Sequence, residues 1–257
     1  MGNSKEQGHE KNVANLDQLI AECRMMGDTY HPSRKDLLLE MLMDLRLRAR
    51  AILVAQGTAK SELNMITNVR SMLFAQLPKL ATRIFRAARA SGFTDRSLDD
   101  LKEHLNKIRG RRATSKAAIL KKAAKRTGES KEGETSTPPV TISVSQMGFD
   151  NLAKHFREMI DDVSRNSLYN PNEEDLKLES ITNRLADMDD KNQQCKTAAV
   201  KLFSLRQQRD AVLYKAVTGV CAISAAVKDY VMSVAGARGG VAKRVRNIAF
   251  KKLVTKV

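Results

Sequence analysis

The sequence is poor in aromatic residues, proline and glycine, and these shortages narrow the choice of fold. Of its 257 residues none is Trp and only 4% are aromatic, while Pro occurs 5 times and Gly 13 times. A β-sandwich or barrel needs frequent turns and strands rich in β-branched and aromatic residues, so the composition argues against both. The same composition is compatible with long uninterrupted helices, and 42% apolar residues suffice for a buried core. The composition therefore predicts an all-α protein.

Cysteines and long apolar segments are also scarce. The 3 cysteines, Cys23, Cys195 and Cys221, are odd in number and lack C-x-x-C spacing, which predicts buried thiols in a reducing compartment rather than disulfides or a zinc site. No apolar run approaches the roughly 20 residues of a membrane helix. The N-terminus carries neither a secretory signal nor a myristoylation signal. We therefore expect a cytoplasmic protein with no membrane span.

The spacings typical of catalytic and metal sites are missing as well. No phosphate-binding loop is present. The histidines are dispersed, and His155, beside an apolar face, is interpreted as a boundary residue rather than a ligand. Carboxylates gather at residues 161–162, 173–175 and 187–190, but no Glu-x-x-His follows them, and charges in a first helical turn are the simpler explanation. We expect no enzyme activity, no cofactor and no metal.

One phrase occurs twice, which indicates an internal repeat. Residues 30–40 read YHPSRKDLLLE and residues 169–179 read YNPNEEDLKLE, with Tyr, Pro, Asp, Leu, Leu and Glu at the same spacing. Apolar residues at three- and four-residue steps flank each copy, so the phrase predicts a turn between two helices with facing apolar stripes. The fold class predicted is all-α, with two related antiparallel helical bundles, a tandem duplication, joined by a basic flexible linker.

The domain boundaries follow from this repeat and from the Gly- and Pro-containing stretches that interrupt the helical pattern. The predicted parts are a disordered N-terminus (1–12), a first bundle (13–110), a basic and then Ser/Thr/Gly/Pro-rich linker (111–140), a second bundle (141–236) and a basic tail (237–257).

Within the bundles, the pattern predicts particular helix ends. A helix from Ser33 to Ala55 is expected to end at Gly57, with another over residues 60–76. Pro78 is expected to kink or divide the latter from residues 79–90, which Gly92 ends, and Thr94 or Ser97 caps the next helix. In the second bundle, a long helix from about residue 178 continues toward Tyr214, with Ile181 and Leu185 buried against the face of Phe156.

Basic charge is the strongest functional signal. The sequence has 45 Lys and Arg against 29 Asp and Glu, a net charge of +16, and its acid-free stretches follow the two bundles. Such an excess favours nucleic acid or an acidic protein surface as partner. The candidate contact residues are Arg109, Arg111, Arg112, Lys121, Lys122, Lys125, Arg126, Arg238, Lys243, Arg244, Arg246, Lys251 and Lys252.

No recognition-helix motif or aromatic stacking platform accompanies these cations, so reading of a base sequence is not expected. The sequence thus favours a non-enzymatic structural or adaptor protein that binds an acidic partner, most plausibly nucleic acid or a nucleoprotein assembly. The alternative is a self-assembling helical scaffold, a homo-oligomer whose charge serves subunit contacts or solubility.

Several segments resemble a family of helical bacterial proteins to which no activity is assigned. They are LPKLATRIFRAARASG followed by KIRGRRA, then ISVSQMGFDNLAKHF, LYNPNEEDLKLESITNRLADM, VLYKAVTG and VKDYVMSVAG, in the family's order from Leu77 onward. The resemblance implies a mostly helical cytoplasmic protein and supplies no functional residues. Where those proteins end with Ser-Pro-x-Tyr and a short basic tail, this chain has Arg238-Gly239-Gly240-Val241.

Overall fold

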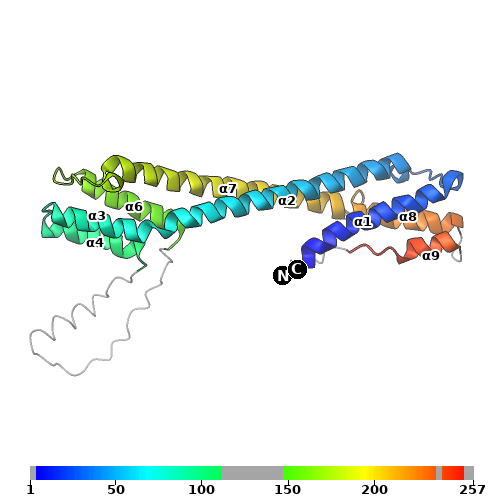
Figure 1. Cartoon of the computed structure of the whole chain (residues 1–257). Coiled ribbons are helices and arrows are strands. Elements are labelled where there is room, and N and C mark those ends of the chain that lie inside the picture. The colour runs from blue at the N-terminus through cyan, green and yellow to red at the C-terminus, as the bar shows by residue number, and fades with distance from the viewer. Residues whose placement is uncertain (1–3, 111–146, 236–238, 252–257) are drawn as a thin grey trace, which may run out of the picture. The chain divides into compact units, whose positions relative to one another are not determined.

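The computed structural model describes residues 4–110, 147–235 and 239–251, and within these ranges the protein is all-helical, without a strand. This confirms the predicted all-α class (Figure 1). The predicted linker, residues 111–140, lies outside the described residues. No helix in the described part of the chain is both long enough and apolar enough to cross a membrane.

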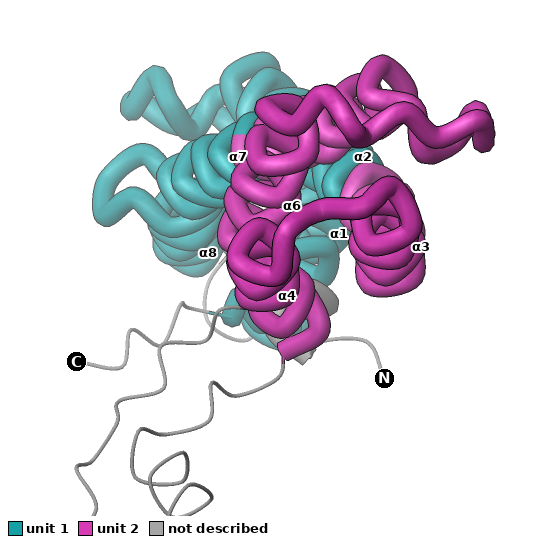
Figure 2. Tube along the Cα trace, turned by 90° about the vertical axis from the view of Figure 1, so that its left-hand side faces the viewer, with its two compact units in different colours: residues 1–64, 197–257 teal, residues 65–196 magenta. Residues whose placement is uncertain are grey.

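The helices form two compact units, and the division differs from the predicted one. Unit 1 comprises residues 1–64 and 197–257, and unit 2 comprises residues 65–196 (Figure 2). Each unit therefore combines segments from both halves of the chain, whereas the sequence suggested one bundle per half. The reason is that α2 (Leu39–Ala75) and α7 (Leu178–Tyr214), each 37 residues long, begin in one unit and end in the other.

Unit 1 assembles the beginning and the end of the chain around one core. Besides parts of α2 and α7 it contains α1 (Ser4–Met25), η1 (Gly27–Thr29), η2 (Lys35–Leu37), α8 (Val220–Ala235) and α9 (Gly240–Asn247). Its core includes Leu16, Leu19, Leu42, Leu213 and Val227, all completely buried. Leu16 and Leu19 are among the regularly spaced apolar residues before the first Tyr-x-Pro phrase, and their burial confirms that these residues form an inward face.

Unit 2 has a separate core formed by the middle of the chain. It contains α3 (Leu77–Ala90), α4 (Asp95–Ile108), α6 (Phe149–Ser164) and η3 (Glu174–Leu176), with the end of α2 and the start of α7. Phe156, Ile181 and Leu185 are buried in the same cluster, as the sequence predicted. Phe74, near the end of α2, is also part of it.

The two Tyr-x-Pro phrases adopt the same local structure, one in each unit. The hydroxyl of Tyr30 donates to the carbonyl oxygen of Leu37 at 2.7 Å, and that of Tyr169 donates to the carbonyl oxygen of Leu176 at 3.0 Å. Both tyrosines are buried. Each phrase continues through a single 3-10 turn into one of the 37-residue helices. The phrase therefore encodes an equivalent inter-helix turn in both places, as expected.

Helix ends marked by special residues were predicted better than helix interiors. Gly92, the second residue after α3, has a φ of 83°, and the Thr94 side chain accepts the backbone N–H of Ser97 to cap α4. Pro78 is in the first turn of α3, which follows α2 after a single residue. In contrast, Gly57 does not end a helix but lies within α2, because a helical glycine costs only about 1 kcal/mol and neighbouring turns pack well.

The N-terminus also differs from the prediction of disorder over residues 1–12. Helix α1 begins at Ser4, and His9 and Asn12 are buried in unit 1. This stretch has no apolar periodicity, because its buried side chains are polar and are held by hydrogen bonds. His9 Nδ1 lies 2.6 Å from the hydroxyl of Tyr214.

Candidate functional site

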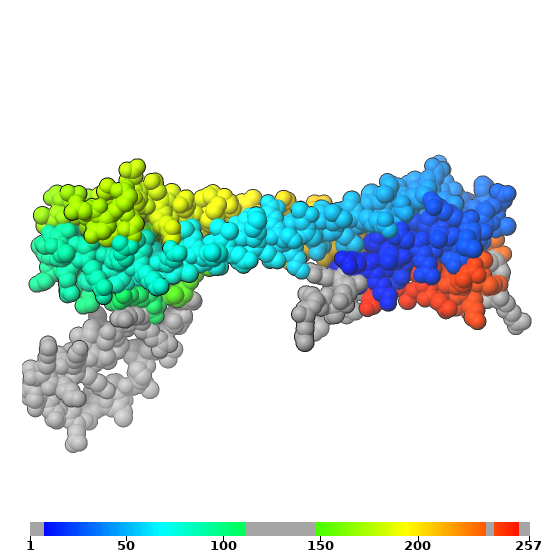
Figure 3. All heavy atoms as spheres, in the orientation of Figure 1, coloured from blue at the N-terminus to red at the C-terminus, as the bar shows by residue number. Residues whose placement is uncertain are grey.

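The C-terminal basic segment is fixed to the surface of unit 1. Asn12, which is completely buried, donates to the carbonyl oxygen of Lys251 and accepts its backbone N–H, both at 2.8 Å. Asn15 donates to the carbonyl oxygen of Ala249 at 2.7 Å. Figure 3 shows residues near the start of the chain, in blue, against α9 in red. Residues 239–251 therefore belong to unit 1, rather than forming the separate tail that the sequence suggested.

Five of the predicted contact residues lie in the described part of the chain: Arg109, Lys243, Arg244, Arg246 and Lys251. The other eight fall outside it, namely Arg111, Arg112, Lys121, Lys122, Lys125, Arg126, Arg238 and Lys252. Arg109 belongs to unit 2 and the other four described residues belong to unit 1. The structure thus groups the cations near the C-terminus on one unit.

Three of these five side chains, those of Arg109, Arg244 and Arg246, are engaged within the protein, and Arg246 Nη2 lies 3.8 Å from Met232 Sδ. Arg244 Nε contacts both oxygens of the Glu22 carboxylate, at 2.8 and 3.0 Å, and this hydrogen bond raises the pKa of the Arg244 guanidinium. The Glu22 side chain is only 10% exposed, so Arg244 satisfies a nearly buried anion. Arg109 donates to the Thr82 hydroxyl at 2.6 Å. By contrast, Lys243 and Lys251 have exposed side chains that form no ion pair with described residues.

The basic excess is concentrated in unit 1. Within the described ranges, unit 1 has 18 Lys and Arg against 11 Asp and Glu, a net charge of +7, whereas unit 2 has 16 against 15, a net charge of +1. Two further exposed cations, Lys11 and Lys215, are next in sequence to Asn12 and Tyr214. The Asn12 side chain donates a hydrogen bond to the hydroxyl of Tyr214 and another to the carbonyl oxygen of Lys251.

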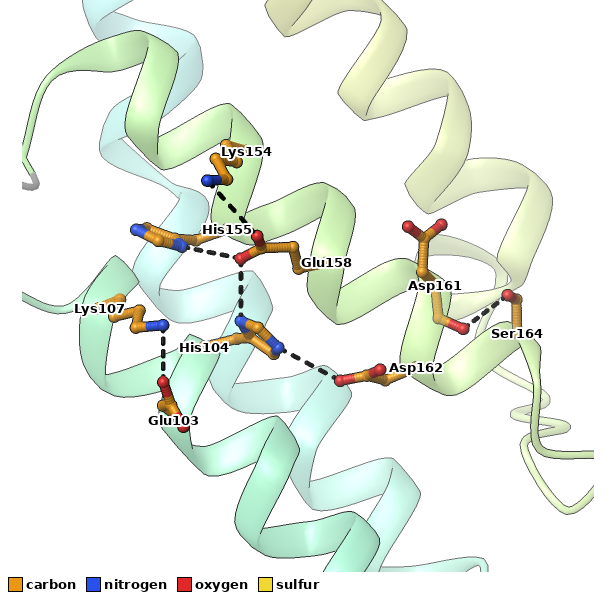
Figure 4. A network of polar contacts seen from close by, with 9 residues as sticks. All are labelled: Glu103, His104, Lys107, Lys154, His155, Glu158, Asp161, Asp162 and Ser164. Atoms are coloured by element: carbon orange, nitrogen blue, oxygen red, sulfur yellow. Dashed lines mark hydrogen bonds and ion pairs between the residues drawn. The ribbon is translucent and has the colours of Figure 1, made fainter.

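A second group of polar side chains lies between α4 and α6 of unit 2 (Figure 4). His104 Nδ1 is 3.2 Å and His155 Nδ1 is 3.0 Å from the same atom, Glu158 Oε2. On the other side of the His104 ring, Nε2 is 3.3 Å from Asp162 Oδ2. His155, Glu158 and Asp162 share one face of α6, since they are three and four residues apart. We call these four residues the histidine cluster.

The electrostatics of the histidine cluster favour an anionic Glu158. Burial raises the pKa of Glu158, but the hydrogen bond from His155 and the electrostatic effect of His104, His155 and Lys154 outweigh it, so the pKa lies below its usual value. Next to the cluster, a hydrogen bond from Lys107 lowers the pKa of Glu103. Among the described residues, His104, His155 and Glu158 are the set whose ligand atoms lie close enough together, within 4.8 Å, to hold a metal ion.

Sequence reasoning missed the histidine cluster for a specific reason. His104 and His155 are far apart along the chain and were interpreted as dispersed, and His155 is buried rather than at a boundary. Only the packing of α4 against α6 brings them together. One local signal was available, because His155-x-x-Glu158 is the reverse of the Glu-x-x-His order that was sought.

The other carboxylate groups form ordinary ion pairs. Asp175 contacts Arg83, and Asp189 contacts Arg157 at 2.5 Å. The hydrogen bond from Arg83 lowers the pKa of Asp175. These pairs are largely exposed, so they orient side chains and contribute little to stability.

In comparisons with known proteins, no family model matches the chain, and no curated protein or solved structure is significantly similar to it. The function is therefore argued from the residues themselves.

Proposed function

We propose that the protein is a non-enzymatic adaptor whose unit 1 binds an anionic polymer, most plausibly nucleic acid or a nucleoprotein assembly, without reading its sequence. The supporting observation is the unequal division of charge, with +7 on the described part of unit 1 and +1 on that of unit 2. Phosphate contacts need exposed Lys and Arg side chains on a surface of fixed shape, and they specify no base. Lys243 and Lys251 meet this requirement, since α9 and the segment after it are packed on α1.

The experiment is a titration of the protein against duplex DNA and single-stranded RNA at several salt concentrations. Phosphate binding releases counterions, so log affinity falls linearly with log salt, with a slope of about −0.9 per neutralised phosphate on duplex DNA. The test variant is Lys243→Glu with Lys251→Glu. We expect it to weaken binding equally for unrelated sequences and to flatten the slope by about 2.

A matched control makes the same change of charge in unit 2. Lys79→Glu with Lys102→Glu alters two exposed lysines there and should leave the slope nearly unchanged. Arg244 is left intact, because reversing it would place a second anion against the nearly buried Glu22. The proposal fails if the wild-type protein binds neither polymer at low salt, or if both double variants weaken binding alike.

A second candidate, self-association into a scaffold, is favoured by apolar side chains that α2 leaves exposed. Leu47 and Val54 are 58% and 69% exposed in unit 1, and Met65 and Met72 are 62% and 73% exposed in unit 2. Each pair is spaced by seven residues, which is the repeat of a coiled-coil seam. Sedimentation of the wild type and of Leu47→Lys with Val54→Lys tests this candidate, because an assembly through α2 would dissociate in the variant.

We further infer that the two halves arose by duplication. Support comes from the paired tyrosine turns and from the equal length of α2 and α7. Helices α1 and α6 also bury residues at matching steps before each turn: Val13, Leu16, Leu19, Ile20 and Cys23 in one, and Ala153, Phe156, Met159, Ile160 and Val163 in the other. The histidine cluster has no counterpart in unit 1, since Asn15, Gln18 and Glu22 stand at the steps of α1 that match His155, Glu158 and Asp162. The duplication would therefore explain the architecture, but not this cluster.

A further inference from the structure

The histidine cluster contains two atoms whose contact requires a cation or a proton between them. His104 Nδ1 is buried and lies 3.2 Å from Glu158 Oε2, yet it forms no hydrogen bond in this arrangement. When the ring proton is on Nε2, where it faces Asp162, the lone pair of Nδ1 faces the carboxylate. A lone pair and an anionic oxygen at this distance repel each other. A positive charge bound to both atoms would turn this repulsion into attraction.

The spacing of the three donor atoms fits a small tetrahedral metal ion. Zinc binds His nitrogen and carboxylate oxygen at about 2.0–2.2 Å, which places neighbouring ligand atoms about 3.3 Å apart around a tetrahedron. Glu158 Oε2 is 3.2 Å from His104 Nδ1 and 3.0 Å from His155 Nδ1, and the three ligand atoms all lie within 4.8 Å of one another. Small side-chain rotations are therefore enough to reach coordination distances.

The chemistry of the donors selects among metals. Two imidazoles and one carboxylate suit Zn²⁺, whereas Mg²⁺ and Ca²⁺ prefer oxygen ligands alone. Asp162 is placed to become the outer partner that ligating histidines usually have, because its Oδ2 is buried without a hydrogen bond and lies 3.3 Å from His104 Nε2. Lys154, at 3.9 Å from the other oxygen of Glu158, leaves that carboxylate with a nearby counter-charge.

We propose that His104, His155 and Glu158 form a Zn²⁺ site that links α4 to α6, with Asp162 as the residue that positions His104. Three protein ligands leave a fourth position for water, and the Glu158 side chain, 36% exposed, provides access to solvent. The His155 side chain is 7% exposed and anchors the site in the core of unit 2. This site is independent of the anion-binding surface proposed for unit 1.

The test is zinc binding by the full-length protein after treatment with a chelator. Isothermal titration with Zn²⁺ near pH 7.5 should show one ion per chain, and Mg²⁺ should show no binding. Zinc should also raise the melting temperature, since a ligand that binds only the folded state stabilises it. Substitution with Co²⁺ should give the absorption bands of a tetrahedral site.

Variants separate the ligands from their supporting residue. His104→Ala and Glu158→Gln should each abolish stoichiometric binding and the rise in melting temperature, while Asp162→Asn should lower affinity by about 10–100-fold and retain binding. His31→Ala is the matched control, because it removes an exposed histidine from unit 1 and should change neither readout. Glu158→Gln preserves side-chain shape, so its circular dichroism should match the wild type.

Three outcomes would overturn the proposal. The first is no stoichiometric binding of zinc by the wild type. The second is unchanged binding in His104→Ala and Glu158→Gln, which would place the ion elsewhere. The third is equal loss of binding in His31→Ala. In the first case the cluster is a proton-bridged group of two histidines and two carboxylates, without a metal.

Discussion

Replacing Tyr30 or Tyr169 by Phe should destabilise the protein by similar amounts, because the two hydroxyls make the same kind of hydrogen bond, each in its own unit. Each donates to a carbonyl oxygen seven residues further on, in a buried turn. A buried acceptor left without its donor costs about 1–3 kcal/mol, and Phe keeps the ring and its packing. We therefore expect each single variant to lose about 1–3 kcal/mol of unfolding free energy, with the two losses within about 1 kcal/mol of each other.

The assay must resolve the two units, since a single transition would hide which one is weakened. Native-state hydrogen exchange followed by mass spectrometry reports each helix separately. Tyr30→Phe should accelerate exchange in α1 and α8, and Tyr169→Phe in α4 and α6. As a control, Tyr230→Phe removes a hydroxyl that accepts the exposed backbone N–H of His31, so its cost should stay below about 1 kcal/mol. If both tyrosine variants were as stable as wild type, or if one alone were destabilised, the two turns would not be equivalent.

Three further substitutions or modifications test the cores and the helices. Leu185→Ala should cost about 2–5 kcal/mol in a urea melt, because it leaves a cavity in the core cluster that contains Phe156, and an unchanged melt would show that this face is placed wrongly. Gly57→Ala should stabilise by about 0.5–1 kcal/mol, since the glycine is exposed within α2 and an added Cβ meets no atom within 4 Å; a loss of stability would mean that the helix breaks there. Burial raises the pKa of the Cys23 thiol to about 11, so alkylation at pH 8 followed by peptide mapping should label the half-exposed Cys221 first, and faster labelling of Cys23 would contradict its burial.

The buried faces and several ends of the helices could be predicted from the sequence, because they depend on residues close to one another in the chain. The period of apolar residues identified the buried faces around Leu16 and Phe156, because a helix in a two-layer packing must turn one stripe inward. Glycine at a positive φ and a capping threonine act within a few residues, so the ends at Gly92 and Thr94 were visible. The same local rules gave the wrong result at Gly57, where packing on either side of the glycine outweighs its low helix propensity.

Contacts between distant segments could not be predicted in this way. The pairing of Asn12 with the backbone of Lys251 depends on a fold in which α1 and the C-terminus meet, and a lone Asn in a polar stretch carries no sign of it. The pairing of His104 with Glu158 likewise depends on which helix packs on α4. In both cases the residue types were ordinary and only their positions in space made them a site.

The same dependence on distant segments explains why the chain cannot be divided into two autonomous halves. Residues 1–110 supply Leu16 to the core of unit 1 and Phe74 to the core of unit 2, and residues 147–257 supply Leu213 and Phe156 to the same two cores. Neither fragment contains a complete core, so each alone should expose these side chains and unfold without a cooperative transition.

Mixed in equal amounts, the two fragments can bury all four side chains again, and association then supplies the hydrophobic free energy that each lacks. We expect separately purified fragments 1–110 and 147–257 to form a 1:1 complex whose circular dichroism and melting are close to those of the intact protein, with a midpoint that rises with concentration. A fragment that melted cooperatively alone, at the temperature of the intact chain, would show that one half folds by itself. The exchange of segments between the units would then be unnecessary for stability.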